Sequence, residues 1–220
     1  MPAIAEQLKN IRQKMGLAAK QAGRDPSSID LIAVSKGQGA ELVREAMKSG
    51  QDYFGENRVQ EAQNKFTKLR PLHAPLKLHL IGPLQTNKAE AAVLLFDVIQ
   101  TLDRPNLAEA LAKAIRKAGR SPKLYVEVNI GQEPQKAGTA PKDLEIFLKY
   151  CRETCLLTID GLMCIPPQAV DPEPYFIDMK KLASKHGLKR LSMGMSADFE
   201  TAIRCGATEV RVGSALFGQR

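Results

Sequence analysis

The sequence predicts a single domain over residues 1–220, an α/β fold built as one (β/α)8 TIM barrel with an additional amino-terminal helix. Segments typical of buried strands alternate with segments typical of helices, and the connections between them are short. Strict alternation favours parallel strands, and about eight such units in one domain favour a closed barrel. An open doubly wound sheet is the alternative, but residues 35–41, SKGQGAE, lack its G-x-G-x-x-G phosphate loop.

The first half of the chain begins with an amphipathic helix over residues 4–20. Ile4, Leu8, Ile11 and Met15 recur there at helical spacing, with Lys and Arg on the opposite side. The turn GRDPSS then leads into the first strand. The expected elements that follow are a strand at 29–35, a helix at 40–50, a strand at 52–57, a helix at 59–70, a strand at 76–82 and a helix at 86–96.

The second half continues the alternation without a break. Pro105 and Gly119 mark the two ends of one helix. Residues 165–175, IPPQAVDPEPY, are rich in proline but separate a strand from a helix, so we expect a long barrel loop there. The expected elements are a strand at 98–102, a helix at 105–119, a strand at 123–130, a helix at 140–154, a strand at 157–165, a helix at 173–187, a strand at 189–194, a helix at 196–206 and a strand at 208–213.

Composition and charge indicate an ordinary soluble protein. Hydrophobic residues make up 44% of the chain and charged residues 25%, and no apolar run reaches membrane-spanning length. The start, MPAIAEQLKNIRQKMG, mixes charge into every turn, unlike a secretory signal, so we expect a cytosolic protein. The net charge of +8 is spread along the chain and tryptophan is absent, which favours a small anionic ligand over nucleic acid.

The four cysteines, Cys151, Cys155, Cys164 and Cys205, are expected to be reduced thiols. They form no CxxC pair, and three of them have mainly apolar sequence neighbours. Cys151 and Cys155 fall at i and i+4 of the expected helix, but no nearby His or Cys completes a set of zinc ligands. We therefore expect no metal.

Polar residues stand where several expected strands end. In a barrel of this kind the chemistry lies at the carboxyl ends of the strands. Lys36 follows the first strand, Asn57 follows the second, and Arg211, Gly213 and Ser214 close the last one. Because these ends meet at one mouth, we expect a shared site there.

The loops after the seventh and eighth strands, MGMSADFE and VRVGSALFG, predict a phosphate site. Barrels of this kind frequently bind phosphate there, on backbone N–H groups. Ser196 offers a hydroxyl, and Gly213 lets its own amide and that of Ser214 come close to a ligand. Taken alone, Ser196 fits equally well as the N-cap of the following helix.

A partly desolvated Lys36 in the same mouth predicts imine formation with a carbonyl compound. Together with a phosphate site, this indicates an aldehyde that bears a phosphate. Pyridoxal phosphate has those features, but so do the sugar phosphates of Schiff-base aldolases, and spacing alone does not choose between them. Arg211 favours pyridoxal phosphate, because a guanidinium beside the pyridine nitrogen keeps that nitrogen unprotonated. The alternative for Arg211 is an ion pair with a barrel carboxylate such as Glu127.

Six stretches carry a family resemblance. They are AVSK, FGENRVQEAQNK, HLIGPLQTNK, GLMCIPP, SMGMSADFETAI and VRVGSALFG, in this order along almost the whole chain. Together they closely resemble the pyridoxal phosphate homeostasis proteins, the YggS/PROSC family. The resemblance implies a barrel like the amino-terminal domain of alanine racemase, of fold type III, that holds pyridoxal 5'-phosphate as a Schiff base on Lys36.

The resemblance also implies a role for each residue at the mouth. Ser196, Gly213 and Ser214 hold the phosphate, Arg211 faces the pyridine nitrogen, and Asn57 lies near the phenolic side of the ring. His79 lies in mid-strand and is expected to be a hydrogen-bonded residue of the barrel interior. The functional role expected for it is a position under the cofactor ring. The loop 129–138 resembles the family loop in which a second lysine, here Lys136, takes part in moving the cofactor.

The chain departs from the family pattern near these positions. Residues 36–39 read Lys-Gly-Gln-Gly, where the family usually follows its lysine with threonine and another lysine. Gly131 replaces a serine, and Ser214 replaces a threonine. Because Ser214 keeps the hydroxyl, phosphate binding is expected to survive.

The resemblance implies a protein that buffers pyridoxal phosphate and delivers it to dependent apo-enzymes, supporting amino-acid and vitamin B6 balance, rather than an efficient enzyme. Alanine racemases need a tyrosine that a second domain delivers across a dimer interface. A chain of 220 residues has no room for that domain, which also favours a monomer. The alternative is a weak amino-acid racemase or Schiff-base lyase that uses the same lysine, and a nucleic-acid-binding module is a third hypothesis.

Overall fold

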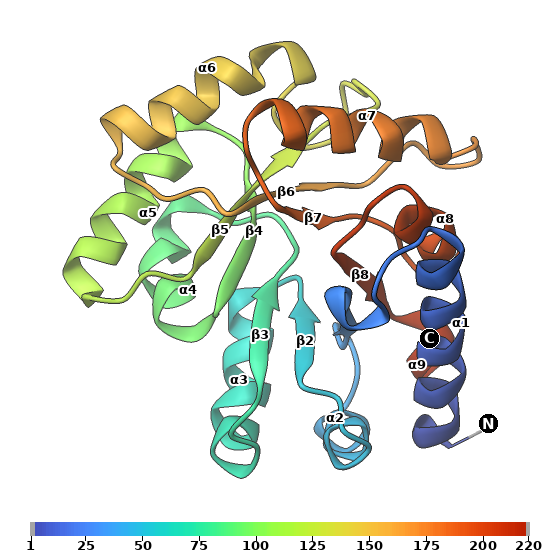
Figure 1. Ribbon diagram of the computed structural model, residues 1–220. Helices are drawn as coiled ribbons and strands as arrows, with labels where there is room; N and C mark the ends of the chain where they lie inside the picture. Colours follow the sequence, from blue (N-terminus) through green and yellow to red (C-terminus); the bar gives the residue numbers. More distant parts are fainter. Residues whose placement is uncertain (1–2, 219–220) are drawn as a thin grey trace.

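Eight parallel strands close into a barrel in the computed structural model, which describes residues 3–218 (Figure 1). The strands pair in chain order, and β1 closes the barrel on β8 with Ile32 opposite Arg211. The predicted fold class is confirmed; residues 1–2 and 219–220 of the predicted domain lie outside the described residues. The strands are β1 Asp30–Val34, β2 Tyr53–Glu56, β3 Lys77–Leu80, β4 Val98–Leu102, β5 Lys123–Val128, β6 Gly161–Cys164, β7 Arg190–Ser192 and β8 Glu209–Val212.

The helices cover the outside of this barrel (Figure 1). They are α1 Ile4–Gln21, α2 Ala40–Lys48, α3 Val59–Leu69, α4 Ala89–Leu95, α5 Pro105–Ala118, α6 Leu144–Lys149, α7 Glu173–Lys185, α8 Phe199–Arg204 and α9 Ser214–Phe217. Short 3-10 turns lie at Pro26–Ser28, Thr86–Lys88, Arg70–Leu72 and Pro141–Asp143, with a π-helical turn at Tyr150–Thr154. Among residues 3–218, no helix is both long enough and apolar enough to cross a membrane.

Several elements are shorter than the sequence predicts. The helix expected at 196–206 begins only at Phe199, because residues 195–198 form a turn in which Asp198 Oδ1 accepts the Met195 N–H at 2.5 Å. The strand expected at 157–165 is reduced to Gly161–Cys164. Just before it, the Asp160 N–H donates to the Leu124 carbonyl at 2.8 Å, and the Asp160 carboxylate accepts the Leu124 N–H at 3.0 Å. The helix α9 was not predicted.

The main hydrophobic core lies between the strands and the helices. Phe54 of β2 and Phe66 of α3 are fully buried there, with ring centroids 5.7 Å apart. The amino-terminal helix α1 extends this layer by packing against α2, α8 and α9 (Figure 1). The four residues whose spacing predicted α1 are its buried face, together with Ala18 and Ala19.

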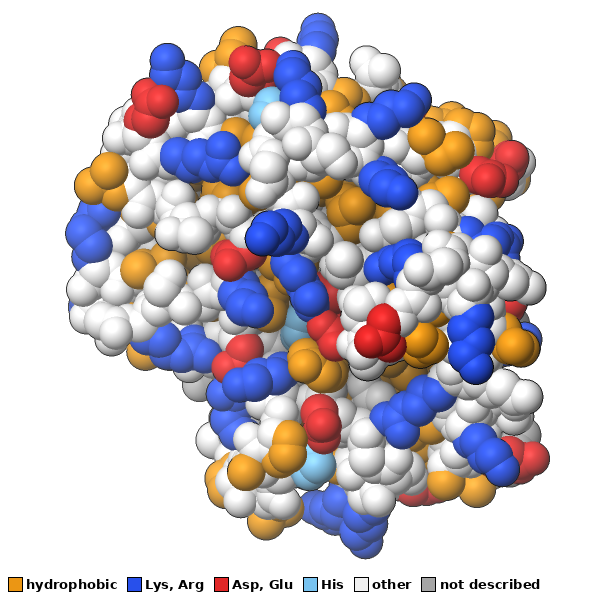
Figure 2. Space-filling view, in the orientation of Figure 1, with side chains coloured by type: hydrophobic (Ala, Val, Ile, Leu, Met, Phe, Trp, Pro, Cys, Tyr) orange, Lys and Arg blue, Asp and Glu red, His pale blue; other side chains and the backbone are white. Residues whose placement is uncertain are grey.

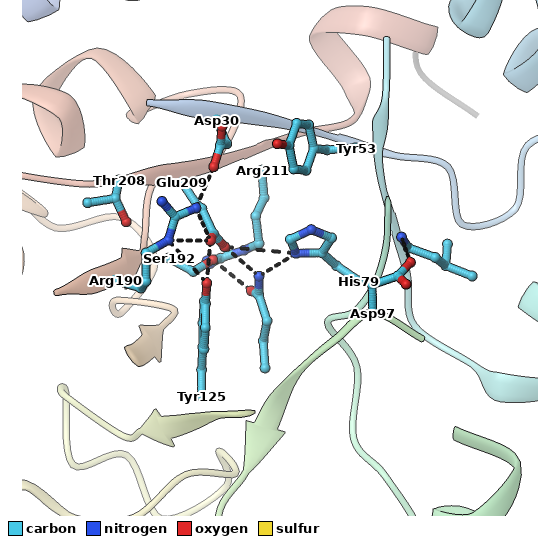
Figure 3. A network of polar contacts seen from close by, with 12 residues as sticks. Asp30, Tyr53, His79, Asp97, Tyr125, Arg190, Ser192, Thr208, Glu209 and Arg211 are labelled. Carbon is cyan, nitrogen blue, oxygen red and sulfur yellow. Dashed lines mark hydrogen bonds and ion pairs between the residues drawn. The ribbon is translucent and has the colours of Figure 1, made fainter. Parts of the chain in front are cut away.

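The inside of the barrel is mostly polar, whereas branched apolar residues fill most barrels of this class. Its one small apolar cluster consists of Val98, Tyr125 and Met163, with Ile165 packed against it. Hydrogen bonds and ion pairs join the inward polar side chains, and Figure 3 shows several of them pointing toward one another.

All four cysteines are free and buried. Burial raises the pKa of the Cys151 and Cys164 thiols to about 12, so both are protonated and unreactive near neutral pH. No group of three or more His, Cys, Asp or Glu side chains within residues 3–218 is arranged to hold a metal ion.

Candidate cofactor-binding site

A cavity of about 580 Å³ opens at the carboxyl ends of the strands. We call it the mouth cavity. Apolar side chains from Val34, Ile81, Ile165 and Met195 form part of its wall. The structure brings six of the seven predicted site residues to this wall: Lys36, Asn57, Ser196, Arg211, Gly213 and Ser214.

His79 is the predicted residue that does not line the mouth cavity. It is 2% exposed and lies inside the barrel, where Gln100 Nε2 is 2.9 Å from its Nδ1. Ile81, two residues further along and on the same side of the chain, does line the cavity. Two residues of strand span about 6.6 Å, so His79 lies one layer deeper. The expected hydrogen-bonded interior position is confirmed. Ile81 rather than His79 lines the mouth cavity, and a place for His79 under the cofactor ring stays a prediction.

Lys36 stands half-buried at the end of β1, and the backbone beyond it turns sharply. Gly37 has a φ of +70°, a left-handed conformation that glycine adopts far more readily than other residues. Its N–H donates to Glu61 Oε1 at 2.5 Å. This turn accounts for Gly37, one of the departures from the family pattern, and it places Gln38 on the cavity wall.

A buried ion pair between Lys65 and Glu56 holds the backbone next to Lys36. Lys65 Nζ of α3 donates to Glu56 Oε1 at 2.8 Å and to the Ser35 carbonyl at 2.7 Å, and Ser35 Oγ donates to the same carboxylate oxygen at 2.7 Å. Burial raises the pKa of Glu56, while the bonds from Lys65 and Ser35 lower it. Together with the Gly37 bond, these contacts fix the backbone on both sides of Lys36.

The pairing of Lys65 with Glu56 was not predicted from the sequence, although the sequence contains a signal for a buried lysine. Lys65 falls within the apolar stripe of α3, and all five residues of that stripe are buried: Val59, Ala62, Lys65, Phe66 and Leu69. A lysine in such a stripe is rarely buried without a partner. The partner Glu56 lies on another element, so local spacing does not identify it.

Ser196 joins the loops that follow β7 and β8. Its Oγ accepts the N–H groups of Gly213 and Ala215 at 3.3 and 3.4 Å. The N-cap alternative is wrong, because Asp198 occupies that position of α8. The hydroxyls of Ser196 and Ser214 therefore border the cavity together with the backbone of Gly213.

Arg211 lies at the base of the mouth cavity, 4% exposed. Its Nη1 donates to Ser192 Oγ and its Nη2 to the Cys164 carbonyl, both at 2.8 Å. Burial lowers the pKa of Arg211, but a guanidinium remains protonated at any physiological pH. Two neutral acceptors thus fix a buried positive charge beside the cavity.

The ion pair of Arg211 with Glu127, the alternative from the sequence, does not form among the described residues; neutral acceptors hold the guanidinium instead. Burial, with a smaller contribution from Asp103, raises the pKa of Glu127 to about 7, although Arg211 lowers it. Glu127 therefore exchanges a proton close to neutral pH.

The loop 129–138 stands apart from the mouth cavity. Asn129 Nδ2 donates to the Glu133 carbonyl at 2.8 Å, and Lys136 Nζ donates to the Pro166 carbonyl at 3.0 Å. A Cβ on Gly131 would lie 2.4 Å from Pro167 Cγ, so this close approach excludes the serine of the family pattern. Lys136 is tied to the loop after β6 rather than directed at the cavity.

The closed barrel and the lysine at its mouth define a protein of the alanine racemase amino-terminal-domain class. The model of the family "Alanine racemase, N-terminal domain" matches residues 3–220, and the chain belongs to that family.

Within this class, the chain belongs to the pyridoxal phosphate homeostasis proteins. It is 38% identical to the pyridoxal phosphate homeostasis protein of Aquifex aeolicus, over 98% of this chain and 97% of the relative. The corresponding protein of Pseudomonas aeruginosa is 39% identical over 100% of this chain and 97% of its own. The solved structure of PipY from Synechococcus elongatus, described as having pyridoxal phosphate bound, superimposes with a TM-score of 0.85. It is 40% identical and covers 98% of this chain and 100% of its own.

Proposed function

We propose that this protein binds pyridoxal 5'-phosphate in the mouth cavity, holds it as a Schiff base on Lys36 and delivers it to dependent apo-enzymes in the cytosol. The observation that carries the proposal is the meeting, in one cavity of about 580 Å³, of an amine, a hydroxyl-and-amide cluster and a buried guanidinium. The PipY structure with pyridoxal phosphate bound supports it, because PipY shares this fold at 40% identity.

The residues of the cavity match the three chemical groups of this cofactor. The amine of Lys36 condenses with the aldehyde and releases water. Ser196 and Ser214 would donate their hydroxyls to the phosphate beside the Gly213 backbone, whose N–H would turn from Ser196 Oγ to the phosphate, and Asn57 would lie near the phenolic side of the ring. A sugar phosphate would use the amine of Lys36 and the phosphate-binding residues. It would leave the buried charge of Arg211 without a role.

Arg211 also favours a holding role over turnover. Its guanidinium is held by Ser192 and Cys164 and keeps its protons at any physiological pH, so it would not transfer a proton to a pyridine nitrogen. An unprotonated ring withdraws electrons weakly. In addition, none of the four tyrosines of this chain lines the mouth cavity, and a racemase needs such a second base. A weak racemase or lyase that uses Lys36 is the alternative function.

Borohydride reduction tests the proposal. The protein is incubated with pyridoxal phosphate, its visible absorbance is recorded, and the reduced adduct is located by peptide mapping. We expect a pyridoxyl group on Lys36, the same adduct in the control Lys48→Ala, whose lysine is exposed on α2, and none in Lys36→Ala. No adduct in the unmodified protein would contradict the proposal and would favour a sugar-phosphate aldolase instead.

A second assay separates holding from catalysis. The loaded protein is incubated with L-alanine in deuterated water, and exchange of the α-proton is followed. We expect no exchange above the rate of free pyridoxal phosphate. Exchange that disappears in Lys36→Ala would favour the racemase alternative.

A further inference from the structure

Lys36 occupies one corner of a tight turn that follows β1. The Gln38 N–H donates to the Ser35 carbonyl at 3.0 Å, which closes a β-turn over residues 35–38. The φ of Gly37 is +70°, whereas that of Lys36 is negative. Of the standard β-turns, only type II combines a negative φ at its second residue with a positive φ at its third. Lys36 is therefore the second residue of a type II turn.

A turn of this shape has an alternative form, because the peptide between its two central residues can flip. The flip converts type II into type I, in which ψ of the second residue is about −30° instead of about +120° and no residue needs a positive φ. Here the central peptide joins Lys36 to Gly37. A flip moves the carbonyl carbon of Lys36 and tilts its Cα–Cβ bond, and the tilt is magnified along the long side chain. The orientation of this peptide therefore sets where the Lys36 amine lies in the mouth cavity.

Glu61 of α3 favours the observed orientation of the peptide. Its Oε1 accepts the Gly37 N–H at 2.5 Å, and this N–H belongs to the peptide that would flip. After a flip, the Lys36 carbonyl oxygen would face Glu61 in place of the N–H. A carboxylate and a carbonyl oxygen both only accept hydrogen bonds, so they repel each other. Glu61 thus stabilises the type II form and destabilises the type I form.

The Glu61 carboxylate is itself held in place by Lys65, which lies four residues further along the same face of α3. Lys65 Nζ donates to Glu61 Oε1 at 3.3 Å. The same ammonium group is anchored by Glu56 and by the Ser35 carbonyl. Glu61 also lies in the first turn of α3, where the helix dipole stabilises a negative charge. A rigid helix therefore presents the acceptor to the turn.

Glu61 stands outside both the core and the mouth cavity. Its side chain is 32% exposed, whereas that of Glu56 is fully buried, so replacing Glu61 leaves no void in the core. It does not line the mouth cavity. Its contact with the turn is thus its route to a ligand there.

We propose that Glu61 is a positioning residue for Lys36. It holds the Lys36–Gly37 peptide in the type II orientation and thereby directs the amine at the aldehyde of a ligand in the mouth cavity. This inference rests on the function proposed above, and it assigns a role to a side chain that touches neither the ligand nor the reacting amine's cavity wall.

Two ligands that differ in one group separate positioning from general damage to the site. Pyridoxal 5'-phosphate carries the aldehyde with which Lys36 reacts, and pyridoxine 5'-phosphate carries an alcohol in its place. In Glu61→Ala, the equilibrium constant for the Schiff base, measured by visible absorbance, is expected to fall about tenfold, the order of one hydrogen bond to a carboxylate. Pyridoxine 5'-phosphate, measured by calorimetry, is expected to bind with an unchanged Kd, because the phosphate-binding residues are untouched.

Two further variants show whether the acceptor oxygen or the charge of Glu61 is responsible. The amide oxygen of Glu61→Gln accepts the Gly37 N–H as the carboxylate does, so we expect its Schiff-base constant to be close to that of the unmodified protein. Charge needs its own control, because the net charge is +8 and Figure 2 shows Lys and Arg side chains distributed over one face of the molecule. Glu41→Ala, at an exposed position of α2, makes the same charge change and is expected to bind both ligands as the unmodified protein does.

The proposal would be overturned by any of three results. They are a normal Schiff-base constant in Glu61→Ala, equal weakening of both ligands in that variant, and a Glu61→Gln variant as weak as Glu61→Ala. If the unmodified protein formed no Schiff base, the function proposed above would be contradicted, and the role of Glu61 would fall with it.

A test without any ligand keeps these two failures apart. Gly37→Ala places a side chain where φ is +70°, so it is expected to lower the folding equilibrium constant about fivefold in the unmodified protein. In the Glu61→Ala background the turn is free to adopt type I, so the same substitution is expected to lower it less than about twofold. Urea unfolding measures both. Equal losses in the two backgrounds would show that Glu61 does not hold the peptide, and would overturn the proposal whatever the ligands do.

Discussion

The two sides of the barrel wall are built on opposite principles. Side chains that point outward, such as Phe54 and Leu78, are apolar and pack against the helices. Side chains that point inward, such as Gln100, Ser192 and Glu209, are polar and satisfy one another by hydrogen bonds. The outer layer therefore supplies most of the stability, which leaves the inner side free to carry charge and to form the mouth cavity.

Removing a large outward side chain tests this division most severely. Phe54→Ala deletes a fully buried ring that contacts Phe66, and the free energy of unfolding is expected to fall by about 3–5 kcal/mol. Ile146→Ala, at a position 73% exposed on α6, is expected to change it by less than about 0.5 kcal/mol. Urea unfolding measures both, and similar losses would contradict an outer layer that dominates stability.

The inward side should differ from the outer layer in its response to pH. The pKa of Glu127, about 7, lies above its ordinary value of 4.5, so the folded protein holds an extra proton between these values. The resulting stability is fully present below the lower pKa and is lost as the pH rises through 7. Relative to Glu127→Gln, the unmodified protein is expected to lose about 2–3 kcal/mol between about pH 5 and 8. Urea unfolding at several pH values measures this, and a constant difference would exclude the shift.

A smaller loss of stability is expected when the Ser192 hydroxyl, which bonds both Arg211 and Gln100 inside the barrel, is removed. Ser192→Ala removes the acceptor of Arg211 Nη1 and the donor to Gln100 Oε1, which is expected to destabilise the protein by about 1–2 kcal/mol. Ser184→Ala, at an exposed position of α7, is the matched control and is expected to have almost no effect. Thermal unfolding compares the two, and an unchanged Ser192 variant would mean that water replaces the hydroxyl without loss.

The outer layer was also the easier part to predict from the sequence. Its apolar residues recur at the spacing of helices or form short buried runs, and together with the glycines and prolines at turns they located the elements of the barrel. The mouth residues were predictable for another reason, because Lys36, Asn57 and Arg211 come at or just after the points where strands end, and those ends meet in any closed parallel barrel.

The parts that escaped prediction depend on how the elements face one another. The depth of His79 is set by the layers of the barrel, which put Ile81 at the cavity instead. The pairing of Lys65 with Glu56 joins a helix to a strand. The helix α9, Ser214–Phe217, is too short for any periodicity to reveal it. Local patterns contain none of this information.

The hydrogen bonds that join Arg211 to His79 through Ser192 and Gln100 run from the mouth cavity toward the opposite end of the barrel (Figure 3). Such a chain resembles a proton wire, but it cannot conduct. The amide of Gln100 neither takes up nor releases a proton near neutral pH, and the guanidinium of Arg211 does not give one up. Proton hopping along this chain therefore stops at Gln100, so the chain joins the two ends of the barrel mechanically without passing a proton between them.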